Sequence, residues 1–263
     1  MDYKRVAENI RGELRDYLRE TGLKSLVIGI SGGIDSTVCV ALARPVCDEL
    51  GVTLIGRSIP IETNKQDEID RARMVGECFC HNFKEMNSLG KPYSVLEERI
   101  HLGEGVANDK IAKGNLKARL RMIYLYNLAG MNSGMVLGTS NRTEVLLDFY
   151  TIGGDGCADY EMIYDLWKTE VYGIASYLAN EFEDDRAKEA IRACIEAKCT
   201  DGLGISESDV EQFGVDSYEE VDKILKDYII SKNITYENHT VIQRYKRRFK
   251  HKLPIKLFRN NIL

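Results

Sequence analysis

The stretch Leu26-Val27-Ile28-Gly29-Ile30-Ser31-Gly32-Gly33-Ile34-Asp35-Ser36 decides the fold class of this chain. An apolar run leads into a glycine-rich turn, and the turn leads into a segment with helical character. Such a turn exposes backbone N–H groups, and the helix dipole adds partial positive charge, so an anion site is expected. Asp35 would repel a phosphate unless a Mg²⁺ ion lay between them. We therefore expect a metal-assisted nucleotide site, and the plainer alternative is an ordinary strand-to-helix turn.

The order Ser-Gly-Gly-Ile-Asp-Ser at 31–36 is more specific than a pair of glycines. It lacks the Gly-Lys-Ser/Thr of a Walker motif and the Gly-x-Gly-x-x-Gly of a dinucleotide-binding turn. It resembles the Ser-Gly-Gly-x-Asp-Ser loop of the ATP pyrophosphatases, which cleave ATP between its α and β phosphates and adenylate a substrate. The loop alone leaves amide synthetases, GMP synthetases and tRNA-modifying enzymes open.

Composition narrows the class of protein. The chain has 263 residues, 44% hydrophobic and 29% charged, which suits one large globular domain or one domain with an appendage. Apolar runs stay well short of the ~20 residues of a membrane span, and the first residues do not resemble a secretory signal. The net charge of −5 disfavours general nucleic-acid binding. Seven scattered cysteines suit reduced thiols, so we expect a cytoplasmic protein that binds neither membranes nor nucleic acid.

Apolar periodicity predicts strands that alternate with long helices in the first part of the chain. The expected strands are 25–30, 52–59, 82–87 and 135–137, and the expected helices are 3–20, 36–50 (disturbed near Pro45), 66–80 and 108–131. This alternation predicts an α/β fold with a doubly wound, mainly parallel sheet flanked by helices. Ligands bind at the carboxyl ends of such strands, so the loops after Ile30, Ile59 and Leu137 are expected to face one cleft.

After about residue 165 the sequence predicts a helical C-terminal part. The expected helices are 167–180, 184–197, 217–230 and 235–248. Between them, Lys198–Ser206 is rich in glycine and aspartate. We interpret it as a mobile active-site lid, with a plain exposed connector as the alternative.

The segment Gly138-Thr139-Ser140-Asn141-Arg142-Thr143-Glu144 follows the 135–137 strand. Glu144 and Asp35 would then be carboxylates from neighbouring strand ends, and with phosphates and waters they form the oxygen set that Mg²⁺ prefers. The alternative is a helix cap, with Ser140 or Asn141 at the N-cap and Glu144 in the first turn. Both interpretations can hold together.

Charged residues further along the chain are further candidates for ligand-binding positions. Arg119 and Arg121 lie two residues apart on a predicted helix, so they cannot both face one site. Asp155 and Asp159 lie in a second glycine-rich loop and could contact ribose hydroxyls, a metal or an ammonium ion. Lys168 begins a predicted helix, where the helix dipole disfavours a cation unless it holds a phosphate.

Taken in order, these clusters resemble the ammonia-dependent NAD synthetase family from about residue 5 to Pro254. The motifs are Ser-Gly-Gly-Ile-Asp-Ser (31–36), Gly-Asn-Leu-Lys-Ala-Arg-Leu-Arg-Met (114–122), Gly-Thr-Ser-Asn-Arg-Thr-Glu (138–144), Gly-Asp-Gly-Cys-Ala-Asp (154–159) and Leu-Trp-Lys-Thr-Glu-Val (166–171). The family makes NAD from deamido-NAD (nicotinic acid adenine dinucleotide), ATP and ammonia through an acyl-adenylate, releasing AMP and pyrophosphate. The resemblance also implies a homodimer with the deamido-NAD site at the subunit interface.

The resemblance assigns roles residue by residue. Asp35 and Glu144 would hold Mg²⁺, and Asp35, Lys168 and Asp159 would be catalytic. Our own hypothesis for Asp159 is that its carboxylate binds ammonium and helps to remove its proton. The ATP contacts would come from Gly29, Ile30, Ser31, Gly32, Gly33, Ile34, Asp35, Ser36, Thr139, Lys168 and Thr200. The deamido-NAD contacts would come from Arg119, Asp159, His251 and Lys252.

The chain departs from the family pattern in two places. Ile152 stands where the family often has a lysine, and only Thr200 and Asp209 match cleanly within the lid, 199–210. These departures leave open another adenylating amide ligase or ATP pyrophosphatase that acts on a different acid. A non-catalytic nucleotide sensor is less favoured, because both predicted metal ligands are present. We expect residues 1–263 to form a single synthetase domain without a glutaminase domain, so free ammonia or a separate partner would supply the nitrogen.

Overall fold

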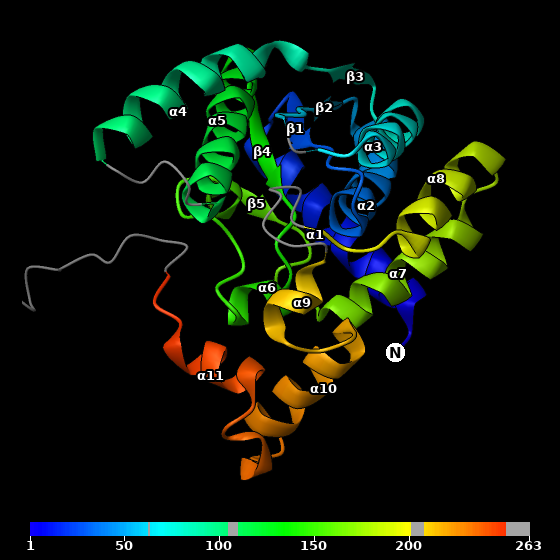
Figure 1. Ribbon diagram of the computed structural model, residues 1–263. Coiled ribbons are helices and arrows are strands. Elements are labelled where there is room, and N and C mark those ends of the chain that lie inside the picture. Colours follow the sequence, from blue (N-terminus) through cyan, green and yellow to red (C-terminus); the bar gives the residue numbers. More distant parts are fainter. Residues whose placement is uncertain (63, 105–109, 201–207, 251–263) are drawn as a thin grey trace, which may run out of the picture.

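A computed structural model of the protein describes residues 1–62, 64–104, 110–200 and 208–250. Its centre is a five-stranded parallel sheet with the strand order β3-β2-β1-β4-β5 (Figure 1). The strands are β1 (Ser25–Gly29), β2 (Thr53–Ser58), β3 (Asn82–Glu85), β4 (Gly134–Gly138) and β5 (Tyr160–Glu161). The chain moves outward from β1 to β3 and then returns to the other side of β1, so ligands are expected at the β1/β4 switch point. The predicted doubly wound α/β fold is confirmed.

Alternation along the strands sends side chains into two separate cores. In β1, Leu26 and Ile28 pack on one face of the sheet and Val27 packs on the other. The first face is covered by α1 (Tyr3–Thr21), α2 (Ile34–Leu50), α3 (Gln66–Phe79), α7 (Lys168–Glu181) and α8 (Asp185–Glu196). The second is covered by α4 (Gly90–Glu104) and α5 (Lys110–Met131) (Figure 1). Both faces of a parallel sheet are therefore buried, as this architecture requires.

The C-terminal helical unit, residues 209–247, packs against one end of this layered structure. It comprises α9 (Asp209–Phe213), α10 (Tyr218–Ile229), a 3₁₀ turn (Ile234–Tyr236) and α11 (Thr240–Arg247). Its own apolar core includes Phe213, Val221 and Val241, and it continues into Leu147 and Trp167 of the main body. Through these contacts α10 lies beside α6 (Arg142–Leu146) and the start of α7 (Figure 1).

Some elements differ from the sequence-based expectations. α2 begins at Ile34 and runs through Pro45 without ending there, because most of its residues are buried and packing outweighs one missing hydrogen bond. The pattern did not predict α4, α9 and β5, of which the last two are too short for a clear period, and it offered α6 only through the helix-cap alternative at 140–144. Pro92 lies in the first turn of α4, where its missing N–H costs little. Across the described ranges, no helix combines the length and apolar character needed to cross a bilayer.

Candidate active site

The turn between β1 and α2 is held by its own side chains. The Ser31 and Ser36 hydroxyl oxygens lie 3.2 Å apart, Gly33 N donates to Ser31 Oγ at 3.2 Å, and Ser36 Oγ donates to the Gly33 carbonyl at 3.2 Å. Gly32 has φ +81°, and a Cβ there would lie 2.3 Å from the Glu68 carbonyl oxygen. The turn is therefore shaped before any ligand arrives, and only glycine fits at position 32.

A cavity of about 420 Å³ opens beside this turn, within the range of small-molecule sites. The loops after Ile30, Ile59 and Leu137 all line it, which confirms the predicted cleft at the carboxyl ends of the strands. The predicted site residues that line it are Gly29–Ser36, Thr139, Glu144, Lys168 and Thr200. Several cationic side chains that the sequence did not single out also line it, namely Arg57, Arg71, Lys198, Arg244 and Lys250.

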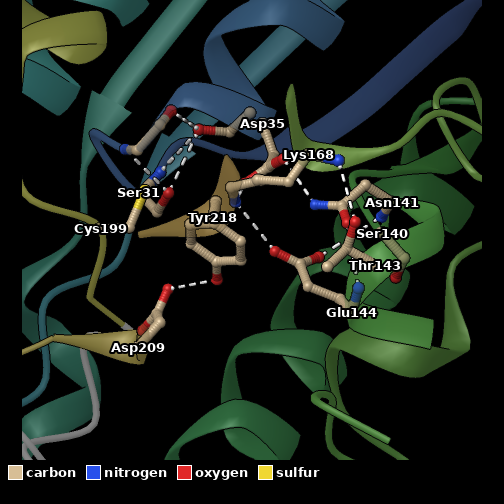
Figure 2. Close-up of polar contacts among 12 residues, drawn as sticks. Ser31, Asp35, Ser140, Asn141, Thr143, Glu144, Lys168, Cys199, Asp209 and Tyr218 are labelled. Carbon is tan, nitrogen blue, oxygen red and sulfur yellow. Dashed lines mark hydrogen bonds and ion pairs between the residues drawn. The ribbon is translucent and has the colours of Figure 1, made fainter. Parts of the chain in front are cut away.

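Lys168 links the two predicted metal ligands. Its Nζ lies 2.5 Å from Asp35 Oδ2 and 3.0 Å from Glu144 Oε1 (Figure 2), and the lysine side chain is only 2% exposed. Burial opposes the charge of Lys168, but the two carboxylates outweigh it and raise its pKa well above the ordinary value. Burial raises the pKa of Glu144 to about 8, and the nearby Asp35 adds to this effect while Lys168 opposes it. One ammonium therefore serves two carboxylates and cannot fully neutralise both.

Asn141 joins a helix cap to this charge cluster. Its side-chain oxygen accepts from Glu144 N at 3.0 Å, and its backbone N donates to Glu144 Oε2 at 3.3 Å, so α6 begins with a capping box. The amide nitrogen of the same side chain donates to Asp35 Oδ1 at 2.9 Å. The helix-cap interpretation is confirmed, and the cap also orients both carboxylates toward Lys168 (Figure 2).

The C-terminal helical unit adds Tyr218 and Asp209 to the charge cluster around Lys168. The Tyr218 ring lies 5.0 Å from Lys168 Nζ, and its hydroxyl donates to Asp209 Oδ2 at 3.0 Å (Figure 2). Burial raises the pKa of Tyr218 well above its ordinary value, so the phenol stays protonated. At the start of the predicted lid, Thr200 Oγ1 donates to Glu68 Oε1 at 2.6 Å. No local pattern pointed to Tyr218, since aromatic residues on an amphipathic helix usually pack in the core.

Arg119 and Asp159 are absent from the described residues that line the cavity. Arg119 is exposed, and its Nε donates to the Ile152 carbonyl at 3.1 Å. The Asp159 carboxylate accepts from the Tyr126 hydroxyl at 3.0 Å and from Val136 N at 2.8 Å. Both side chains therefore have partners within the chain, outside the Lys168 cluster.

Arg121 lines the cavity where Arg119 does not. Its Nε donates to the Ile59 carbonyl at 2.9 Å and a terminal nitrogen donates to Asn64 Oδ1 at 2.9 Å. Burial lowers the pKa of its guanidinium to about 10. The expectation that only one of the two arginines faces a given site is confirmed for this cavity. The predicted contacts His251 and Lys252 lie outside the described residues.

Comparison with known proteins places this geometry in a family. The family model described as NAD synthase matches residues 6–255, nearly the whole chain. The chain belongs to the NAD synthase family. Among curated members, the NH(3)-dependent NAD(+) synthetase of Thermococcus kodakarensis is 33% identical over 272 residues and covers 97% of each chain. That of Thermoplasma acidophilum is 35% identical over 227 residues, covering 86% of this chain and 85% of the relative.

Solved structures of NAD synthase relatives share the fold. An NMN synthetase from Francisella tularensis superposes with a TM-score of 0.80 at 25% identity and covers 99% of both chains. An NH3-dependent NAD synthetase from Campylobacter jejuni gives a TM-score of 0.69 at 20% identity, covering 94% of this chain and 93% of the other. The second likeness supports the fold alone.

Proposed function

We propose that this protein is a ligase that amidates deamido-NAD with ammonia, uses ATP as co-substrate and releases AMP and pyrophosphate. The observation that carries the proposal is the buried Lys168, shared by Asp35 and Glu144 beside the 31–36 turn. This cluster combines an anion-binding turn, a cation and two carboxylates in one cavity. Membership of the NAD synthase family supports the same activity.

The chemistry follows from the poor leaving group of a carboxylate. The nicotinate carboxylate attacks the α-phosphorus of ATP in line, forming an acyl-adenylate, and the P–O bond to pyrophosphate breaks. N–H groups of the 31–36 turn and the Lys168 ammonium stabilise the departing pyrophosphate. Ammonia then forms the C–N bond, the acyl C–O bond breaks, AMP leaves and a proton is lost. No covalent enzyme nucleophile is needed, so the thiols have no part in this scheme.

We propose Mg²⁺ as the metal held by Asp35 and Glu144. Their oxygens are the hard ligands that Mg²⁺ prefers, and they already converge on one cation, the Lys168 ammonium. When bound, the ion neutralises charge on the phosphates. The described residues hold no cluster of three or more His, Cys, Asp or Glu ligands, so phosphates and waters would complete the shell. With the ion bound, Lys168 would be released from one carboxylate and would be able to pair with a phosphate instead.

The remaining assignments rest on the resemblance and stay proposals. Arg119, Asp159, His251 and Lys252 would contact deamido-NAD across the interface of a cytoplasmic homodimer. A role for Asp159 in binding ammonium predicts that Asp159→Asn raises the KM for ammonia. Because this carboxylate also holds Tyr126 and Val136, a loss of stability with an unchanged ammonia KM would assign it a structural role instead.

A second candidate is amidation of the corresponding mononucleotide, nicotinic acid mononucleotide. The Francisella tularensis relative is an NMN synthetase, and it covers 99% of both chains at a TM-score of 0.80. The same carboxylate would react, but the substrate would lack the adenylate half. Ile152 is a departure at a position where the resemblance implies a deamido-NAD contact, and the altered lid is a second departure from the family pattern.

A direct assay separates the two candidates. The purified protein is given ATP, MgCl₂, ammonium chloride and one of the two acids, and the amide, AMP and pyrophosphate are quantified. A higher kcat/KM with deamido-NAD supports the first proposal, and a higher value with the mononucleotide supports the second. Turnover of neither acid would contradict both. Replacing ammonium by glutamine tests the nitrogen source, and substantial glutamine-dependent activity would refute the use of free ammonia.

A further inference from the structure

The first turn of α7 has only part of a local cap, in which Glu170 Oε2 accepts a hydrogen bond from Trp167 N at 3.0 Å. The first N–H groups of any helix have no partner within the helix, and a cation at the first position is unfavourable to the helix dipole. Here the helix starts at Lys168, and the N-cap residue is Trp167, whose side chain has no oxygen to accept a hydrogen bond. The N–H groups of Lys168 and Thr169 therefore need side-chain acceptors from other parts of the chain.

Asp222 of α10 supplies that acceptor from a distant part of the chain. Its side chain is buried, since the residue is 1% exposed. One carboxylate oxygen accepts from Thr169 N at 2.9 Å, and the other accepts from the Thr143 hydroxyl at 2.5 Å. The Thr143 oxygen in turn accepts from Lys168 N at 2.9 Å. The buried carboxylate thus accepts a hydrogen bond directly from one N–H group in the first turn of α7, and it reaches a second N–H group through the Thr143 hydroxyl.

This arrangement fixes both sides of the charge cluster at once. Thr143 directly precedes Glu144 on α6, and Thr169 directly follows Lys168 on α7. A negative charge at the helix start also offsets the unfavourable position of the lysine. If the Asp222 contacts were lost, the backbones that carry Lys168 and Glu144 would be free to shift relative to each other.

We propose that Asp222 is a positioning residue, which holds Lys168 and Glu144 in register for the reaction from within the C-terminal helical unit. The proposal rests on the proposed function, because its catalytic consequence acts through Lys168. Asp222 touches neither the cavity nor the reacting atoms. Its effect is expected in kcat more than in the KM for ATP, because the 31–36 turn keeps its own hydrogen bonds.

The first test is a double-mutant cycle between Asp222→Asn and Lys168→Met, with initial rates of AMP formation as the readout. Asp222→Asn keeps the side-chain volume and removes the charge, so kcat should fall roughly 10- to 100-fold, as expected for a lost charge-assisted hydrogen bond. In the Lys168→Met background the same substitution should cause no further fall. An equal fall in both backgrounds, or an unchanged kcat in the single variant, would overturn the proposal.

Matched variants separate positioning from general destabilisation. Asp227→Asn makes the same charge change on the same helix, away from the contacts of Asp222, and should leave kcat unchanged. Thr143→Ser keeps the bridging hydroxyl and should retain activity. Thr143→Val removes the hydroxyl at nearly constant volume and should resemble Asp222→Asn. Equal loss in the serine and valine variants would contradict a role for the hydroxyl bridge.

Amide hydrogen exchange tests the contact without turnover. Exchange at Lys168 and Thr169 should be faster in Asp222→Asn and Thr143→Val than in the wild type or Asp227→Asn. Unchanged exchange at these amides would overturn the proposal. Should the wild type amidate neither acid, the proposed function fails, and this measurement still decides whether Asp222 holds the start of α7.

Discussion

The 31–36 turn and the C-terminal helical unit reach the same cavity by different means. The turn is shaped by contacts within itself, such as those of Ser31, Gly33 and Ser36. The helical unit acts through contacts between distant segments, with Tyr218 over Lys168 and Asp222 on Thr143, 79 positions away. The comparison indicates that the reaction type is encoded locally, whereas the placement of the buried charge depends on tertiary packing.

The largest effect on activity is expected from a substitution in the 31–36 turn. Asp35→Ala removes the carboxylate that pairs with Lys168 at 2.5 Å, and AMP formation should fall by about 10³-fold or more. The fold should survive, because the hydrogen bonds of the Asp35 carboxylate within the described part of the chain go to two site residues, Asn141 and Lys168. Rates and thermal unfolding should be measured beside Asp48→Asn, an exposed change on the same helix. Normal turnover in Asp35→Ala would reject its role.

A smaller effect on activity is expected from a substitution in the C-terminal helical unit. Tyr218→Leu removes the ring over Lys168, and kcat should fall roughly 3- to 30-fold, the range of a desolvated cation–π contact. Tyr218→Phe keeps the ring and loses only the hydroxyl bond to Asp209, so its loss should be smaller. Steady-state kinetics of both variants checks the order. Equal losses would show that the bond to Asp209, and not the ring, supports Lys168.

A further effect, on stability and not on rate, concerns pH and the balance of charge in the ligand-free protein. The pKa of Glu144 is raised from 4.5 to about 8, so in that window the folded state holds more protons than the unfolded state. The free energy of unfolding should therefore fall as pH rises from 4.5 to about 8. Glu144→Gln lacks this titration, so its stability relative to the wild type should increase across the window. Urea unfolding at several pH values measures the difference, and parallel curves would contradict it.

The difference between local contacts and contacts between distant segments also explains what the sequence could predict. The sheet, its flanking helices and the cavity edge followed from apolar periodicity and from the rule for parallel sheets. Lys168 stood out because a cation at a helix start conflicts with the dipole, and the structure pairs it with Asp35 and Glu144.

Other parts of the site could not be predicted from local pattern. Spacing showed that Arg119 and Arg121 face different ways, but not which one meets the cavity, because that depends on how α5 rotates on the sheet. Asp222 lies on an amphipathic helix whose acidic residues are usually solvated. Asp222 is buried because α10 packs against the start of α7, and this tertiary contact cannot be read from the local pattern.

Trp167 gives the molecule a built-in optical probe. It is the single tryptophan of the chain, it is 6% exposed, and it directly precedes Lys168. The Arg142 guanidinium lies 4.9 Å and the Lys226 ammonium 5.0 Å from the indole ring. Indole emission responds to nearby charge and to water, so the intrinsic fluorescence of the protein reports on the environment of one residue at one helix end. Substrate binding that redistributes charge around Lys168 is therefore observable in real time without a label.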